Sequence, residues 1–100
     1  MVAKEPLHRW SWSDDVVVYY LHRYGDRDLP RNEDQILKLL DLKVGSYVRR
    51  KENIRFLEGR GGLPNIALLT KYVYEAFKDE PKSHHQTHVI KILDWHSEKK

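Results

Sequence analysis

Glycine and proline residues divide this chain into short segments, and this division limits its possible folds more than any other feature. Gly25 follows an apolar run, a cluster of glycines occupies residues 59–62, and Pro81 precedes the last segment. Glycine readily ends a helix because it adopts left-handed backbone angles, and proline cannot continue a helix. Each segment between these breaks is therefore expected to form one or two short helices.

The first segment contains the apolar run VVVYYL at residues 16–21. A run this short does not reveal its own period, so a buried strand is an alternative. Its flanking residues favour a helix, because Ser13 is a good N-cap and Asp14 and Asp15 suit the first turn. We predict a helix over 14–24 that ends at Gly25.

The second helix is expected to follow Asn32, which with Gln35 has the pattern of a capping box. This helix should end near Leu42. Residues 43–45 then form a short connector that contains a glycine. The helices on either side of it are predicted to form a helix-turn-helix pair.

The third and fourth helices lie on either side of the glycine cluster. Ser46 is the expected N-cap of the third helix, which should run to about Glu58. Pro64 or Asn65 is expected to open the fourth helix, whose apolar residues recur at helical spacing, and Pro81 closes it.

The last segment permits two interpretations. Residues 87–95 could line a two-faced strand, or they could belong to a helix capped by Ser83, which we favour. We expect residues 1–80 to form the bundle. Residues 81–100 would be a His-rich segment, either a short helix packed on the bundle or a mobile tail.

These segments together predict a small all-α bundle of four or five helices that contains a helix-turn-helix pair. A chain of 100 residues has room for one core only, so a single domain is expected. Cysteine is absent, which excludes disulfides and thiolate metal sites. The longest apolar run is too short to span a bilayer, and residues 1–9 lack the apolar core of a signal peptide. We therefore expect a cytoplasmic protein with no membrane partner.

Positive charge is concentrated in one part of the chain. Residues 43–60 carry six Lys and Arg against two Glu, a net charge of +4, whereas the whole chain carries +3. Cations near a helix start oppose the helix dipole, so a partner that compensates them is expected. A local surplus of this kind is typical of a surface that binds a polyanion.

Double-stranded DNA is the expected partner, with the basic helix at about 46–58 placed in the major groove. Arginine can bind guanine and asparagine can bind adenine through paired hydrogen bonds, so we assign Arg49 and Asn53 to base contacts. The expected contacts with the DNA backbone are Lys43, Ser46, Arg50, Lys51, Arg55 and Arg60.

Two other interpretations of the basic helix remain open. It could be an ordinary solvated face whose acids and bases pair along the helix. It could also contact an acidic protein, which would make the chain a protein–protein interaction module without direct nucleic-acid contact.

The histidines of the last segment raise the question of a metal site. His84 and His88 are four residues apart, a spacing that can hold Zn²⁺ on a helix. A further ligand at a fixed spacing is absent, as is the glutamate of the HExxH motif. A metal-dependent activity through His84, His85 and His88 is the minor alternative, and we expect a protein that is not an enzyme and needs no cofactor.

The run GSYVRRKENIRFLEGRGGLPN, followed by KYVYEAF, resembles a small helical module found ahead of HNH-type endonuclease domains and as free-standing prokaryotic or phage proteins. The opening WSWSDDVVVYYLHRYG is similar to the first helix of that module. The resemblance covers roughly residues 12–77. The matching positions are Gly45–Ser46, Arg50, Asn53–Ile54, Leu57, Gly61–Gly62–Leu63 and Tyr74–Phe77.

This resemblance implies a role in DNA recognition, either in transcription regulation or in restriction-like targeting. We do not expect it to imply DNA cleavage, because the residues after 80 are too few for a nuclease domain. A homodimer, or a larger nuclease or regulatory complex, would fit the same role. A weaker likeness to Myb-type domains rests on Trp12–Ser13, Asp14–Asp15 and Tyr24–Gly25.

Overall fold

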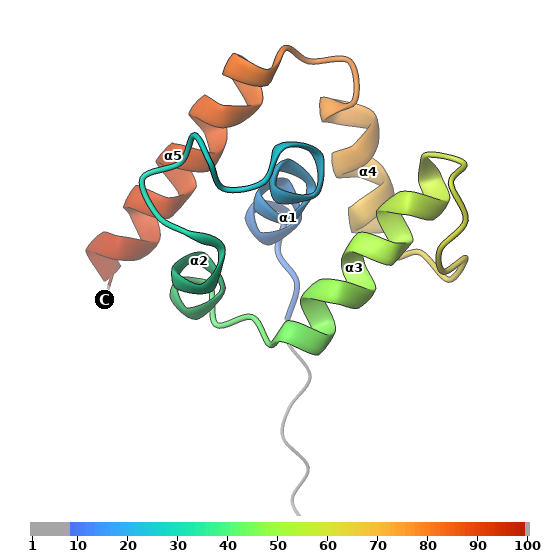
Figure 1. Cartoon of the computed structure of the whole chain (residues 1–100), viewed down its shortest axis with the longest axis horizontal. Helices are drawn as coiled ribbons and strands as arrows, with labels where there is room; N and C mark the ends of the chain where they lie inside the picture. The colour runs from blue at the N-terminus through green and yellow to red at the C-terminus, as the bar shows by residue number, and fades with distance from the viewer. Residues whose placement is uncertain (1–8, 100) are drawn as a thin grey trace, which may run out of the picture.

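The computed structural model describes residues 9–99 and folds them into five α-helices, with no strand among those residues. The predicted all-α bundle is therefore confirmed. No helix in this part of the chain is long and apolar enough to cross a lipid bilayer. The helices are α1 (Trp12–Tyr24), α2 (Glu33–Leu39), α3 (Val44–Leu57), α4 (Leu68–Phe77) and α5 (Lys82–Lys99) (Figure 1).

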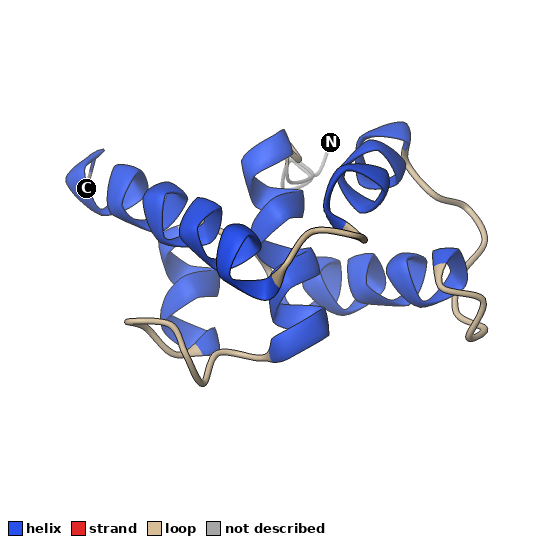
Figure 2. Cartoon of the chain, turned by 90° about the horizontal axis from the view of Figure 1, so that it is seen from above, coloured by secondary structure: helices blue, strands red, loops and turns tan. Residues whose placement is uncertain are grey.

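Helix α1 lies at the centre of the bundle. Figure 1 shows it end-on with the other helices around it, and Figure 2 shows the same helices and their loops from above. It packs against α3, α4 and α5, whereas α2 lies against α5. The side chains of residues 16–20 are all buried. The run VVVYYL is therefore a helix covered on every side, which explains why it shows no amphipathic period.

The N-terminal end of α1 differs from the predicted one. Ser11, and not Ser13, caps the helix: its hydroxyl oxygen accepts a hydrogen bond from the N–H of Asp14 at 3.1 Å. The Asp14 carboxylate in turn accepts one from the N–H of Ser11 at 3.2 Å. This capping box starts the helix two residues earlier than predicted. The C-terminal end is as expected, with Gly25 in the left-handed region at a φ of 73°.

Helix α2 begins as predicted but ends early. Asn32 and Gln35 exchange the two hydrogen bonds of a capping box. Asp41 then adopts a φ of 57°, and the N–H of Leu42 donates a hydrogen bond to the carbonyl oxygen of Leu37 at 2.8 Å. This is a Schellman ending in which an aspartate takes the position usually held by glycine. The expected extension of α2 to Leu42 is therefore wrong.

Helix α3 begins at Val44, so the expected connector at residues 43–45 is mostly helical. Lys43 is the N-cap, and Ser46 lies inside the first turn instead of capping it. The Tyr47 hydroxyl donates a hydrogen bond to the Glu33 carboxylate, which ties α3 to α2. Burial, together with this hydrogen bond, raises the pKa of Tyr47 above its ordinary value. The two helices follow one another closely, but α2 rests on α5 while α3 rests on α1 and α4.

The last two helices complete the core. Helix α4 begins at Leu68 and not at Pro64 or Asn65. The last segment is a helix, as favoured over a strand, but it begins at Lys82, so Ser83 lies within it. The side chains of His85, Val89 and Leu93 are buried in the bundle core. Helix α5 is thus part of the bundle and is not a tail attached to it.

His85 holds α5 to the central helix. It is fully buried, and its Nε2 lies 2.9 Å from the Val16 carbonyl oxygen, to which it donates as the neutral tautomer. Its ring stacks on Phe77 with centroids 4.6 Å apart. Burial lowers the pKa of His85 from 6.5 to about 4, although the hydrogen bond to Val16 opposes this shift.

We predict that the free energy of unfolding falls as the pH drops from 6.5 towards 4, by about 3 kcal/mol in total from His85. The unfolded chain binds a proton in this range that folded His85 does not, so the stability is present above 6.5 and is lost with acid. Urea unfolding at several pH values across this range measures how steeply the free energy of unfolding depends on pH. His85→Gln should reduce this dependence, whereas His88→Gln, at an exposed position of the same helix, should not. Equal slopes for the two variants would contradict the assignment.

Candidate functional site

A buried ion pair fixes the inner side of the basic helix. Nε and one terminal nitrogen of Arg50 donate to the two oxygens of Asp15, each at 2.8 Å. The Thr70 hydroxyl donates to the same carboxylate at 3.1 Å, and the guanidinium lies 4.0 Å from the centroid of the Trp10 ring. Asp15 is 1% exposed and Arg50 is 9% exposed. The expected contact of Arg50 with a DNA backbone is corrected here, because its charged group joins α3 to α1 and α4 inside the protein.

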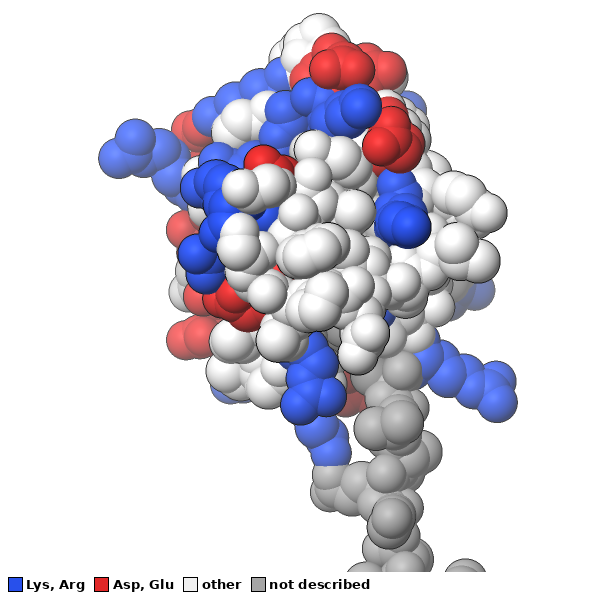
Figure 3. Space-filling view, turned by 90° about the vertical axis from the view of Figure 1, so that its right-hand side faces the viewer, with Lys and Arg blue, Asp and Glu red and all other residues white. Residues whose placement is uncertain are grey.

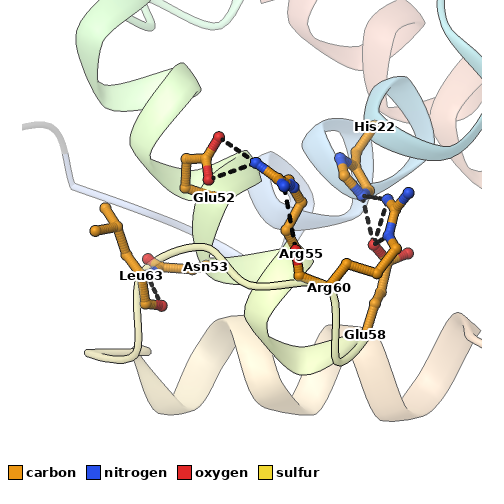
Figure 4. Close-up of polar contacts among 7 residues, drawn as sticks. All are labelled: His22, Glu52, Asn53, Arg55, Glu58, Arg60 and Leu63. Carbon is orange, nitrogen blue, oxygen red and sulfur yellow. Dashed lines mark hydrogen bonds and ion pairs between the residues drawn. The ribbon is translucent and has the colours of Figure 1, made fainter.

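Asn53 is also turned inward, which corrects its predicted contact with DNA bases. It is buried, and its side-chain nitrogen donates to the carbonyl oxygen of Leu63 at 2.9 Å (Figure 4). The N–H of Leu63 donates to the carbonyl oxygen of Glu52 at 3.2 Å. Asn53 therefore holds the connection of residues 58–67 against α3.

Arg55 and Arg60 have partners within the chain. Arg55 donates to both oxygens of Glu52, at 3.1 and 3.0 Å, and to the carbonyl of Arg60 at 3.1 Å (Figure 4). Arg60 lies 2.7 Å from Glu58, which also contacts His22 at 2.8 Å. Burial would raise the pKa of Glu58, but the hydrogen bonds from His22 and Arg60 outweigh it and lower that pKa. Two of the predicted DNA contacts therefore carry charge that is already compensated nearby.

One hollow, of about 520 Å³, lies at the start of α3, and we call it the α3 hollow. Lys43 and Arg49 are exposed at its edge, and Arg49 makes no hydrogen bond or ion pair with the described residues. Lys51 lies apart, with its Nζ 4.3 Å from the centroid of the Tyr47 ring. The structure thus brings together five of the eight predicted residues and leaves Lys51, Arg55 and Arg60 outside the hollow. The α3 hollow is lined by Trp10, Lys43, Gly45, Ser46, Arg49, Arg50 and Asn53.

The start of α3 adds its own positive potential to the hollow. Among the described residues no side chain caps this helix, and its first turn contains no acidic residue. The first backbone N–H groups of a helix have no partner within the helix, and they carry the positive end of its dipole. Such N–H groups beside a hydroxyl and two cations are suited to an anion such as a phosphate.

Sequence reasoning missed two residues that line the hollow. Trp10 precedes the first helix, and its ring lies over the Arg50 guanidinium beside the hollow. Gly45 was expected in a connector, and it lies in the first turn of α3. A buried acid next to an apolar run, Asp15, was the available sign that one arginine had an internal role.

The histidines of α5 do not converge on one point. His85 points into the core, whereas His84 lies 2.7 Å from Glu80 and its ring centroid lies 4.9 Å from that of His88. Within residues 9–99, no group of three His, Asp or Glu side chains is placed to hold a metal ion.

Comparison of the chain with protein-family models, with curated proteins and with solved structures finds no match in any of the three. The resemblance to the module that precedes HNH endonuclease domains stays a prediction.

The glycine turn gives a direct test of how α3 and its connection are held together. A Cβ atom at Gly62 would overlap the carbonyl oxygen of Glu52, whereas one at Gly61 would meet nothing within 4 Å. Their φ values are nearly equal, 86° and 85°, so the backbone strain of a substitution is matched. We predict that Gly61→Ala costs about 1–2 kcal/mol of unfolding free energy and that Gly62→Ala costs clearly more. Equal losses in urea unfolding would show that the close contact at Gly62 is absent.

Proposed function

We propose that this protein binds double-stranded DNA through the α3 hollow. The observation that carries the proposal is the convergence of Lys43, Ser46 and Arg49 on the uncapped start of α3. Double-stranded DNA presents closely spaced negative charges, and neutralising them releases counterions, which drives binding. The site is smaller than the one expected from the sequence, because the polar groups of Arg50 and Asn53 already have partners inside the protein.

The N-terminal half of α3 would approach the duplex. A helix that enters the major groove commonly contacts base edges with its first residues, and the exposed guanidinium of Arg49 is suited to a guanine or a phosphate. The hydroxyl of Ser46 and the first N–H groups of α3 would receive a backbone phosphate. The 58–67 connection is bonded to Glu52 and Asn53 in the C-terminal half of the helix and would keep that half clear of the groove.

A regulatory or DNA-targeting role follows from the family resemblance and belongs to the same proposal. Selection of bound sequences from a random duplex library would separate the two levels of recognition. If the selected duplexes share a consensus sequence, Arg49 would contact base edges. If they share none, the α3 hollow would contact only the DNA backbone.

We predict that Arg49→Ala raises the Kd for duplex DNA several-fold and lowers the slope of log Kd against log salt by about 1. Fluorescence anisotropy of a labelled duplex over a salt series measures both values. Arg27→Ala is the matched control, since it removes the same charge from an exposed position beyond the far end of α1. It should leave the Kd nearly unchanged.

Two results would overturn the proposal. The first is a wild-type protein that does not bind duplex DNA at low salt. The second is an equal loss of affinity in Arg49→Ala and Arg27→Ala, which would mean that charge alone, and no particular surface, attracts the duplex.

A further inference from the structure

An apolar surface separate from the α3 hollow covers the end of the molecule where α3 turns into α4. Four large side chains on α3, on α4 and on the connection between them are 43–63% exposed. Figure 3 views this end and shows a continuous uncharged area with Lys and Arg along its edges. We call this area the α3–α4 face. Its residues are Phe56 on α3, Leu63 in the connection, and Leu68 and Tyr72 on α4.

The elements of this face are held together, so its residues form one surface. The N–H of Leu63 bonds to the carbonyl of Glu52, and Gly62 rests against the backbone of Phe56. Leu68 and Tyr72 are one turn apart on α4, which packs against α3. The face is therefore rigid enough to be recognised without a large rearrangement.

The exposed apolar area of the face is close to the apolar area that one partner buries in a typical protein interface. At roughly 200 Å² for a whole large side chain, the exposed fractions leave about 400 Å² of apolar surface in water. A standard interface buries about 800 Å² per partner, of which about 57% is apolar, or roughly 450 Å². Apolar patches of this size on a small protein commonly mark an interaction site.

The charges beside the face indicate which partner it fits. Arg55 is paired with Glu52, and Arg60 is paired with Glu58, so all four charged side chains of residues 52–60 have partners. These four side chains together carry no net charge, and Figure 3 shows further Lys and Arg at the edges of the face. In a two-fold contact the apolar centres would face each other, and the edge cations would lie at the solvated rim, where water and salt screen their repulsion. Arg55 and Glu52 could also exchange partners between copies, because a two-fold axis brings each surface onto itself.

We propose that the α3–α4 face is the contact of a two-fold symmetric homodimer. Phe56, Leu63, Leu68 and Tyr72 of each copy form its apolar centre, and the Arg55–Glu52 pairs lie at its border. The proposal does not depend on DNA binding, because the α3 hollow uses the other half of α3.

Sedimentation equilibrium of the full chain, without DNA, tests the dimer from about 1 μM to 1 mM. The average mass should rise from 12.0 kDa towards twice that value as the concentration increases. The double variant Leu68→Glu/Tyr72→Glu should stay at the monomer mass throughout, because it places charges at the apolar centre. Both positions are more than half exposed, so far-UV circular dichroism should match that of the wild type.

Trp95→Glu is the matched control, since Trp95 is a large apolar residue that is 56% exposed on α5, away from this face. It should dimerise as the wild type does. A wild-type protein that remains at 12.0 kDa at all concentrations would overturn the proposal. Equal dimerisation of the wild type and the double variant would overturn it as well, because the contact would then lie elsewhere.

Discussion

The buried pair of Asp15 and Arg50 is the interaction that fixes how α1, α3 and α4 lie together. A carboxylate among the valines of α1 is costly to remove from water unless its oxygens find donors. Arg50 supplies two of these donors and Thr70 supplies the third, so each of the three helices contributes one member. Removing one partner from such a pair leaves a buried charge and typically costs 3–5 kcal/mol.

The same pair changes how the basic segment is to be understood. The net charge of residues 43–60 counts Arg50, Arg55 and Arg60, yet each of them has an acidic partner within the protein. Near the start of α3, Arg49 is exposed and makes no hydrogen bond or ion pair with the described residues, and no acid stands in the first turn. Net charge over a segment therefore overstated the extent of the proposed DNA-binding surface.

Local rules predicted the helices, and non-local contacts account for the errors. The all-α fold followed from glycine and proline positions and from caps such as Asn32, which act within a few residues. Asp41 was missed as a helix terminator because a left-handed backbone is uncommon outside glycine. The outward placement of Asn53 failed because α3 buries side chains against α1, α4 and the 58–67 connection at once, so no single polar face exists. A sequence does not show that Arg50 and Asp15, 35 residues apart, will meet.

The neighbouring residues Arg49 and Arg50 provide the most direct measurement. Equilibrium urea unfolding of Arg49→Met and Arg50→Met compares two identical chemical changes at adjacent positions. If Arg50 is the internal partner of Asp15, its substitution should cost about 3–5 kcal/mol, whereas the substitution of Arg49 should stay within about 0.5 kcal/mol. Similar free energies of unfolding for the two variants would contradict the assignment of Arg50 to the core and of Arg49 to the outer surface.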